Sequence, residues 1–410
     1  VPLTVEDFAS PINVAWGFEW RDETYTINAG DEASISAGPV FIFGVGSDGF
    51  QGFPRESAGS FNSDSISAYI DTETDITDKF TLGAALRYED YDSFGDTTNF
   101  KLSGRYQFTD NFALRGTVST GFRAPTPGQI NTLNVTTSAD ASGNLIPSGT
   151  YPVDNPVAQV LGATPLDAEE SRSVTLGAVW QVSDTVDITI DVYDISIDDR
   201  IALFGPNTIS AADAADLAAA GVPNAALLEG SLASFFTNGF DSRVKGIDIA
   251  ITTTFELNSG DLLLDIRHNT NEQEVRNVVA NTINTSRVFD LENQIPDDRT
   301  TVTLDYETSG MFGGYLRLNK YSDWSTTGGL FSPGDASDAF RYGGELIVDA
   351  EARFQLNDIF SFAVGGENIF DTEPDDENDF VLGLLGANTA ITSPFGNNGG
   401  FWYLRLNADF

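Results

Sequence analysis

The chain has 410 residues, with 21 lysines and arginines against 61 aspartates and glutamates, and a formal net charge of −40. This charge argues against nucleic acid as a partner, because phosphate binding needs a basic surface. The sequence has no cysteine, which excludes disulfides and thiolate metal sites. No apolar run approaches the roughly 18 residues of a membrane-spanning helix. A helical membrane protein is therefore excluded, whereas a barrel of alternating strands is allowed.

The first residues, from Val1 to Phe8, read like the middle of a chain and not like a secretion signal. We therefore expect the natural protein to begin further upstream.

The main signal along the chain is strict two-residue alternation of apolar and polar residues, the period of a strand with two unlike faces. One example is 97–108, where Phe100 and Leu102 alternate with Lys101 and Ser103. About fourteen such strands are predicted, at 11–27, 64–76, 80–92, 97–108, 112–122, 169–182, 185–199, 243–257, 260–275, 298–308, 311–324, 342–356, 359–370 and 399–410.

The predicted connections alternate between two lengths. One class consists of tight turns rich in Asp, Asn, Ser and Gly, such as Thr109-Asp110-Asn111. The other class is mostly long, and its main members are 28–63, 123–168, 200–242, 276–297 and 371–398. Short turns on one side and long loops on the other are typical of bacterial outer-membrane barrels. The pattern predicts an all-β, antiparallel up-and-down transmembrane barrel with extracellular loops and a periplasmic C-terminus; a soluble all-β fold is the alternative.

Two further local features stand out. Aromatic residues, including Trp16, Trp20, Trp180 and Trp324, gather near predicted strand ends, where interfacial girdles lie, although aromatics are also general strand formers. In the loop 200–242, Ser210 is a candidate cap for an alanine-rich helix over 211–220. The sequence leaves open whether this helix is a lid or only fills space.

Candidate chemistry in the sequence is sparse. His268 is the only histidine, and no serine is singled out as its catalytic partner, so we interpret it as structural or at the edge of the lumen. The acidic run 371–379 lacks the ordered spacing of a calcium loop, and we interpret it as solvated. Neither an enzyme activity, a metal site nor a cofactor is predicted. Polar residues on the alternating face should line a wet lumen; examples are Arg87, Lys101, Arg105, Arg115, Glu351 and Arg353.

Several segments resemble the TonB-dependent receptor family, in the family's own order. The most recognisable is Ser119 to Thr126, which contains Gly121, Phe122, Arg123, Ala124, Pro125 and Thr126. Others are Leu86 to Tyr91, Asp167 to Gly177 (with Ala168 where proline is usual), and Phe235 to Asn238 followed by Val244 to Asp248. Near the end, Asn368, Phe370 and Asp371 resemble the "N-L-F-D" element, and Phe410 matches the aromatic terminal residue of outer-membrane barrels.

This resemblance implies a nutrient importer of the outer membrane. Family members have an N-terminal plug, a segment that docks the energy-transducing TonB complex, and a barrel of twenty-two strands. No plug-like region precedes residue 11, so we expect this chain to be the C-terminal part of such a barrel, without the plug and about eight strands. Residues 1–410 are then a single barrel portion in contact with outer-membrane lipid.

The resemblance does not name the ligand. An iron–siderophore complex is the family default, and vitamin B12, a carbohydrate or a peptide fragment are open. A passive fourteen-stranded channel and a surface scaffold that binds a surface or periplasmic protein are the alternatives. Candidate contacts for a small-molecule or metal-chelate ligand are the loop aromatics, which could equally pack loops together: Phe204, Phe235, Phe236, Phe331 and Phe340.

Overall fold

The computed structural model of the chain describes residues 1–36, 52–139, 145–280, 282–308, 310–327, 339–377, 379, 382 and 386–408. Phe331 and Phe410 lie outside the described residues. Among those described, no helix is long and apolar enough to span a membrane.

Fourteen long strands are found in the described residues, as the alternation predicts. They are β2 (Ile12–Ile27), β3 (Gly59–Thr77), β4 (Phe80–Tyr91), β5 (Gly95–Thr109), β6 (Phe112–Arg123), β9 (Glu169–Ser183), β10 (Val186–Thr208), β11 (Leu232–Leu257), β12 (Gly260–Arg276), β13 (Asp298–Thr308), β14 (Phe312–Tyr321), β17 (Leu346–Gln355), β18 (Phe360–Glu367) and β19 (Phe401–Ala408).

The remaining described elements are short. The strands are β1 (Pro2–Leu3), β7 (Asn134–Ala139), β8 (Leu145–Thr150), β15 (Trp324–Thr326) and β16 (Phe340–Tyr342). The helices are α1 (Glu32–Ile35), α2 (Pro127–Asn131), α3 (Pro156–Val160), α4 (Ala211–Ala219), α5 (Thr285–Asn293), η2 (Arg55–Ser57) and η3 (Ala225–Leu228).

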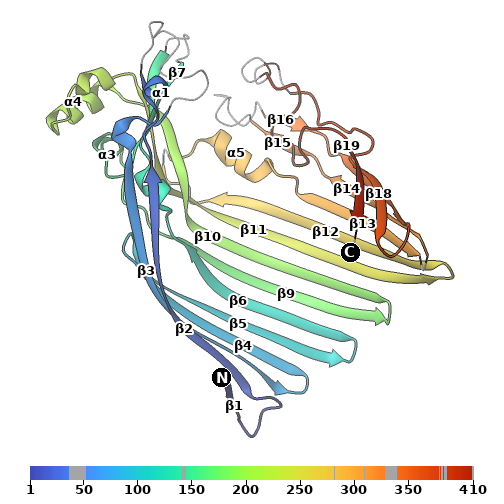
Figure 1. Cartoon of the computed structure of the whole chain (residues 1–410). Helices are drawn as coiled ribbons and strands as arrows, with labels where there is room; N and C mark the ends of the chain where they lie inside the picture. Colours follow the sequence, from blue (N-terminus) through green and yellow to red (C-terminus); the bar gives the residue numbers. More distant parts are fainter. Residues whose placement is uncertain are drawn as a thin grey trace.

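The long strands form one antiparallel meander in which each pairs with the next along the chain, from β2 to β19. Figure 1 shows this sheet curled into a trough that is open between β2 and β19. Within the described residues the register includes no pairing of β19 with β2; the edge of β2 carries only the two-residue strand β1. The fold is therefore a partial barrel wall.

The tight turns form where their residue types predict. At the turn between β17 and β18, the Asn357 side chain accepts hydrogen bonds from the backbone N–H groups of Ile359 and Phe360, both at 2.9 Å. An asparagine that folds back on its own backbone in this way closes a hairpin. The described segments of the long loops lie at the opposite end of the wall (Figure 1).

Several predicted boundaries are wrong. The predicted loop 200–242 is too long, because β10 and β11 stay paired up to Thr208 and Leu232. Register shifts between Ile197 and Arg200 and between Phe204 and Asn207 break the two-residue pattern there, so alternation does not reveal the strands. Likewise β3 begins at Gly59 inside the predicted loop 28–63. The predicted helix is present as α4, with Ser210 as its N-cap.

The predicted strand 311–324 is also wrong at its end. β14 stops at Tyr321, and Trp324 belongs to the separate hairpin of β15 and β16. Trp324 is only 2% exposed, so it is not an interfacial residue. The predicted strand 342–356 correspondingly begins later, at Leu346 in β17.

Apolar burial is concentrated in the loops, not in the wall. One cluster joins the loop after β6 to the loop between β10 and β11; its buried members include Val157, Ile209, Leu217, Phe204 and Phe235. We call the structure around it the cap. A smaller cluster is formed by Trp324, Tyr342 and Ala390. Figure 1 shows α4 of the cap projecting away from the wall, and α5 between the two sides of the trough.

Candidate functional site: the inner face of the wall and its mouth

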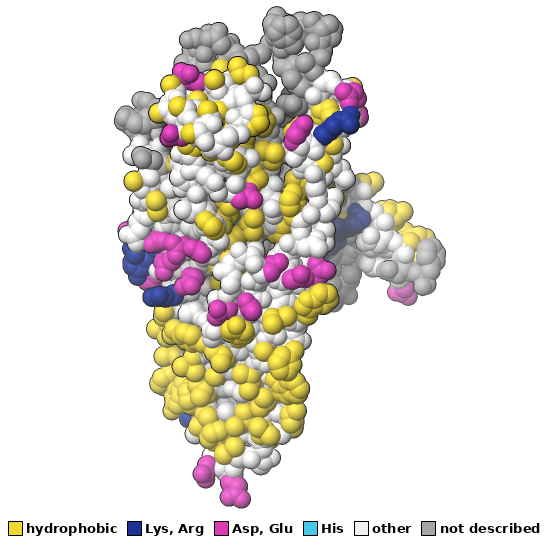
Figure 2. All heavy atoms as spheres, turned by 90° about the vertical axis from the view of Figure 1, so that its left-hand side faces the viewer, with side chains coloured by type: hydrophobic (Ala, Val, Ile, Leu, Met, Phe, Trp, Pro, Cys, Tyr) yellow, Lys and Arg dark blue, Asp and Glu magenta, His cyan; other side chains and the backbone are white. Residues whose placement is uncertain are grey.

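The two faces of the wall differ in chemistry. On one face large apolar side chains are exposed, such as Phe18 (80%) and Leu404 (76%). Figure 2 shows hydrophobic side chains covering the lower part of the face in view, with acidic and basic side chains directly above them. We call this the outer face. The opposite or inner face is polar, and it carries every residue predicted to line the lumen: Arg87, Lys101, Arg105, Arg115, Glu351 and Arg353.

Glycines on the inner face allow ion pairs to bridge strands that are not neighbours. Arg115 of β6 donates two hydrogen bonds, 2.9 and 2.7 Å, to Asp191 of β10. The strand between them has Gly177 at the matching position. A Cβ there would overlap Asp191 Oδ1 and lie 3.0 Å from Arg115 Nε. The missing side chain is therefore what lets the guanidinium reach the carboxylate two strands away.

The same arrangement recurs further along the wall. Arg353 of β17 pairs with Glu307 of β13 at 2.9 Å, across Gly313 of β14. The Tyr403 hydroxyl donates a 2.6 Å hydrogen bond to Glu351, across Gly365 of β18. Arg405 adds hydrogen bonds of 2.9 and 3.1 Å to the same carboxylate. These bridges are specified by register, so sequence alternation alone did not reveal them.

Two adjoining hollows lie on the inner face, with volumes of about 400 and 570 Å³. Both are lined by Asp191 and Asp248, which are opposite each other on β10 and β11. Arg115 neutralises Asp191, whereas Asp248 accepts a 2.6 Å hydrogen bond from the neutral Asn269. The hollows thus offer both hydrogen-bond donors and hydrogen-bond acceptors, some charged and some neutral. A third hollow of about 540 Å³ is lined by the Arg353 and Arg405 cluster.

His268 borders the first of these hollows, but its side chain belongs to the outer-facing row of β12. It pairs in register with Ile249 and Thr300 on the outer face, and its Nδ1 is 2.8 Å from the Thr300 hydroxyl. It therefore links β12 to β13. In the described parts of the chain, no group of three or more His, Asp and Glu side chains is placed to hold a metal ion.

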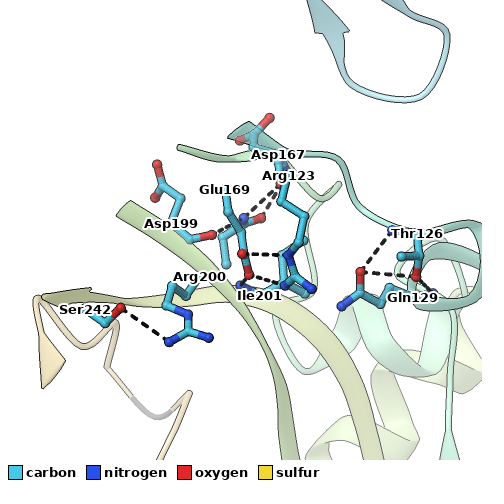
Figure 3. A network of polar contacts seen from close by, with 10 residues as sticks. Arg123, Thr126, Gln129, Asp167, Glu169, Asp199, Arg200, Ile201 and Ser242 are labelled. Carbon is cyan, nitrogen blue, oxygen red and sulfur yellow. Dashed lines mark hydrogen bonds and ion pairs between the residues drawn. The ribbon is translucent and has the colours of Figure 1, made fainter. Parts of the chain in front are cut away.

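Three of the motif segments meet at the loop end of the wall, which we call the mouth. Figure 3 shows two of them, with Arg123 beside Glu169. Arg123, at the end of β6, forms a two-pronged ion pair with Glu169, at the start of β9. Glu169, whose side chain is 6% exposed, also accepts a 2.7 Å hydrogen bond from the backbone N–H of Ile201. This contact lies just past the irregular register of β10. One carboxylate therefore joins three strands, and we call this group the mouth clamp.

Asn238 completes the mouth clamp from β11. Its side-chain amide donates to the carbonyl oxygens of Asp199 (2.7 Å) and Asp167 (3.0 Å), and its Oδ1 accepts from the N–H of Asp167. Asp199 has a positive φ of 56°, a left-handed conformation that Asp adopts more readily than most residues and that this amide contact helps to hold. Burial, followed by the nearby Asp241 carboxylate, raises the pKa of Asp199 above its ordinary value.

The rest of the Ser119–Thr126 motif shapes the loop entry. Thr126 caps α2 through a capping box with Gln129, which ends the wall and turns the chain. Phe122 packs edge-on against Tyr91 at 5.7 Å. Gly121 lies so close to the Ser171 hydroxyl that a Cβ would be 2.9 Å from it. Ala124 and Pro125 form the bend between β6 and α2, where Pro125 is buried.

The Asn368–Asp371 element closes the last long loop. The Asn368 side chain accepts from the N–H of Thr372 and donates to its carbonyl, at 2.9 and 2.7 Å. Asp371 accepts from the N–H of Gly400, at 2.7 Å, where the chain returns to β19. Both Asn368 and Asp371 have positive φ, which Asn and Asp tolerate well. Phe370 between them is 71% exposed.

The predicted ligand-contact aromatics fall into two groups. Phe204 and Phe235 are opposite each other on β10 and β11, are 8% and 2% exposed, and have ring centroids 4.5 Å apart inside the cap. Their role in the structure is packing between loops. Phe236 is half-buried, and Phe340 packs against the Trp324 cluster. Ligand contact by these residues stays a prediction.

A buried carboxylate holds α5 at the mouth. Asp290 is 1% exposed and accepts hydrogen bonds from the Thr327 N–H and hydroxyl, at 2.6 and 2.9 Å, and from the Thr326 hydroxyl at 3.1 Å. Glu292 of the same helix accepts from the N–H of Val275 in β12, at 2.8 Å. The helix is therefore tied both to the wall and to the β15–β16 hairpin. No signal in the sequence singled out Asp290.

The family model described as "TonB dependent receptor-like, beta-barrel" matches residues 3–369. The chain belongs to the TonB-dependent receptor family. This family consists of outer-membrane receptors and transporters, not enzymes. The predicted family and the barrel fold, as part of a larger barrel, are thereby confirmed.

Solved structures of TonB-dependent receptors share the fold. The siderophore receptor PirA from Acinetobacter baumannii has a TM-score of 0.67 at 15% identity, covering 100% of this chain and 53% of that one. A mutant of the ferric enterobactin receptor PfeA from Pseudomonas aeruginosa, in complex with enterobactin, has the same values. The ferric yersiniabactin uptake receptor FyuA from Yersinia pestis has a TM-score of 0.52 at 15% identity, covering 86% of this chain and 46% of that one.

These identities support the fold alone. The chain spans about half the length of the first two structures. No curated protein matches the sequence.

Proposed function

We propose that this chain is the wall of an active importer that takes up an iron–siderophore complex across the bacterial outer membrane. The observation that carries the proposal is the polar inner face, which is bridged by ion pairs and hollowed beside Asp191 and Asp248. It lies below the described loop segments at one end of the wall. A ligand captured between such loops has a hydrogen-bonding surface below it. The known siderophore receptors that share the fold support this ligand class.

In this proposal the long loops face the outside of the cell, and β19 runs toward the periplasm. Uptake is driven by the TonB complex acting on an N-terminal plug, as the family relationship implies. The mouth clamp and α5 set the shape of the entrance, and Phe236 and Phe340 are the candidate loop contacts that are not fully buried. Residues 1–410 act as one barrel unit.

The test is uptake of radioactive iron by cells whose own siderophore receptors are deleted and which express the full natural protein. A panel of ferric catecholates, hydroxamates and mixed-ligand siderophores is supplied, with and without a protonophore. We expect saturable uptake of one class, lost when the proton gradient collapses and lost without TonB. Uptake that ignores the gradient would instead identify a passive channel.

A matched pair of variants tests the role of the mouth. Glu169→Gln removes the charge that holds Arg123 and weakens the contact with Ile201. Glu170→Gln removes the same charge from the neighbouring residue, whose side chain faces outward. We expect weaker ligand binding for the first variant and unchanged binding for the second. Equal ligand binding by the two variants would show that the mouth clamp is not needed for ligand capture.

A further inference from the structure

Acidic residues are concentrated in the connections at the loop end of the wall. In the sequence, these connections hold 24 of the 61 aspartates and glutamates but only three of the 21 lysines and arginines. The rest of the chain holds 37 acidic and 18 basic residues, so the ratio is about eight to one in the connections and about two to one elsewhere. The connections are 28–58, 92–94, 124–168, 209–231, 277–297, 322–345 and 368–400. A ligand that approaches the mouth therefore meets a strongly negative field.

The three basic residues of these connections do little to offset that charge. Arg55 pairs with Glu32, and Arg341 pairs with Asp323. Arg287 of α5 is exposed, and it is the only one of the three without an ion pair to a described residue. A chelate with several negative charges would therefore meet a single available cation in the described connections.

The hollows on the inner face add no surplus of cations. Arg115 is neutralised by a carboxylate, as described above. Arg267 donates two hydrogen bonds, of 2.8 and 2.7 Å, to Asp265 of its own strand. Arg299, the remaining arginine of the first hollow, lies over the Tyr321 ring, 5.0 Å from its centroid. The third hollow is lined by three arginines and three carboxylates, so it too is balanced.

Asp248 differs from these balanced groups. It lines both of the adjoining hollows and is exposed, and it forms no ion pair with a described residue. Its hydrogen-bond donor is the amide of Asn269, which orients the carboxylate without cancelling its charge. A cationic group of a ligand in either hollow would have this carboxylate as its counter-charge.

The classes of ferric siderophore differ in charge. Three catecholates bring six negative charges to Fe³⁺ and leave a trianion, whereas three hydroxamates bring three and leave a neutral chelate. A free primary amine on a hydroxamate chelate is protonated at neutral pH and makes it cationic. An acidic entrance repels the trianion, has no net effect on the neutral chelate and attracts the cation.

We propose that the importer selects ferric tris-hydroxamates over ferric tris-catecholates, and that Asp248 binds the ammonium group of a cationic member of that class. The acidic connections disfavour the trianion at the mouth, and the unpaired carboxylate retains the cation on the inner face. This inference rests on the proposed function, because it names the ligand class of the same importer.

The test is uptake of radioactive iron by cells that lack their own siderophore receptors and express the full natural protein. The chelates are a linear ferric tris-hydroxamate with a free amine, the same chelate with the amine acetylated, and a ferric tris-catecholate. We expect the KM of the amine chelate to be about fivefold below that of the acetylated one. Uptake of the catecholate should be at least about tenfold slower at equal concentration.

The outcomes separate this inference from the proposed function. Energy-dependent uptake of the catecholate at the same rate as the hydroxamates would overturn the inference and leave the siderophore importer intact. Uptake of none of the three chelates would contradict both.

Variants of one inner-face position test the role of Asp248. Asp248→Asn should remove the preference for the amine chelate over the acetylated one, whereas Asp248→Glu should keep it. Asp71→Asn makes the same charge change on the inner face of β3, outside the hollows, and should also keep it. The readout is the ratio between two chelates in the same cells, so a lower amount of inserted protein does not imitate the effect. If Asp248→Asn and Asp71→Asn show the same ratio, Asp248 is not the binding group.

A second pair of substitutions tests the acidic connections. Glu229 and Glu373 are exposed, and neither forms an ion pair with a described residue. The double variant Glu229→Lys and Glu373→Lys should raise catecholate uptake relative to hydroxamate uptake by about threefold. An unchanged ratio would show that the charge of the connections does not select the ligand.

Discussion

Gly177 is predicted to be required for the ion pair between Arg115 and Asp191. In Gly177→Ala the new methyl overlaps Asp191 Oδ1 and approaches Arg115 Nε. Both atoms are at the far ends of flexible side chains, so the side chains should move and the backbone should not. The variant should therefore lose the two hydrogen bonds that cross β9 and keep the strand.

The expected magnitude follows from the exposure of the pair. The Arg115 and Asp191 side chains are 49% and 26% exposed, so solvent screening limits their interaction to about 1 kcal/mol. The released Asp191 also faces Asp248 on the next strand, a repulsion of about 0.5 kcal/mol. Replacing glycine in a strand gains about 0.5–1 kcal/mol of conformational entropy. Gly177→Ala should be destabilised by about 0.5–1 kcal/mol in net free energy of unfolding.

The control is Gly116→Ala, at the next position along the same ladder but on the outer face. A Cβ there meets the Thr175 carbonyl at 3.4 Å and Leu176 Cδ1 at 3.7 Å, which are ordinary contacts. This variant should be stabilised by the entropy gain alone, about 0.5–1 kcal/mol. The two alanine variants should thus differ by about 1–2 kcal/mol.

The assay is urea unfolding of the full receptor in lipid vesicles, followed by tryptophan fluorescence. A double-mutant cycle with Asp191→Ala isolates the pair, because Gly177→Ala should become stabilising once the carboxylate is gone. The reasoning is refuted if the two alanine variants have equal stabilities, or if the Asp191→Ala background leaves the effect of Gly177→Ala unchanged.

Three further predictions concern the loops. Phe235→Ala should lower the free energy of unfolding by about 3–5 kcal/mol and open the cap to proteolysis, whereas Phe236→Ala should not. Equal cleavage of the two variants would contradict the packing role of Phe235. Asp290→Asn should speed amide hydrogen exchange in α5 by at least about tenfold, because a charged acceptor of three hydrogen bonds is lost; unchanged exchange would exclude the carboxylate as its anchor. Hydrogen bonds from the hydroxyl and backbone N–H of Ser210 lower the pKa of Asp213 below 3.8. The stability that the ionised Asp213 gives to α4 through this cap is fully present above pH 3.8. It is lost as the pH falls through the lower pKa of the folded state, so amide protection in α4 should drop in acid. Ser210→Ala should weaken that pH dependence, because only the backbone N–H of residue 210 still donates to Asp213.

Local patterns were sufficient for much of the wall. The alternation around Phe100 and Leu102 predicted both the strand and its two faces, because the side-chain period of a strand is set by its own backbone. Turn residues such as Asn357 predicted hairpins, since their side chains bond to backbone groups two or three positions away. Ser210 predicted the start of α4 for the same reason. Each of these features depends on residues that are close along the chain.

Contacts between distant segments were decided by the tertiary structure. Whether Phe204 meets Phe235, or whether Arg115 reaches Asp191 over Gly177, depends on the register of strands that no single strand encodes. A shift of one residue would turn each of these side chains to the other face. Because the register of β10 is irregular past Ile197, alternation in the sequence did not predict that part of the strand. The mouth clamp lies there and brings Arg123, Glu169 and Ile201 together. The sequence alone thus determined the family and the regular part of each wall strand with its two faces, whereas strand pairing in three dimensions decided which side chains act together.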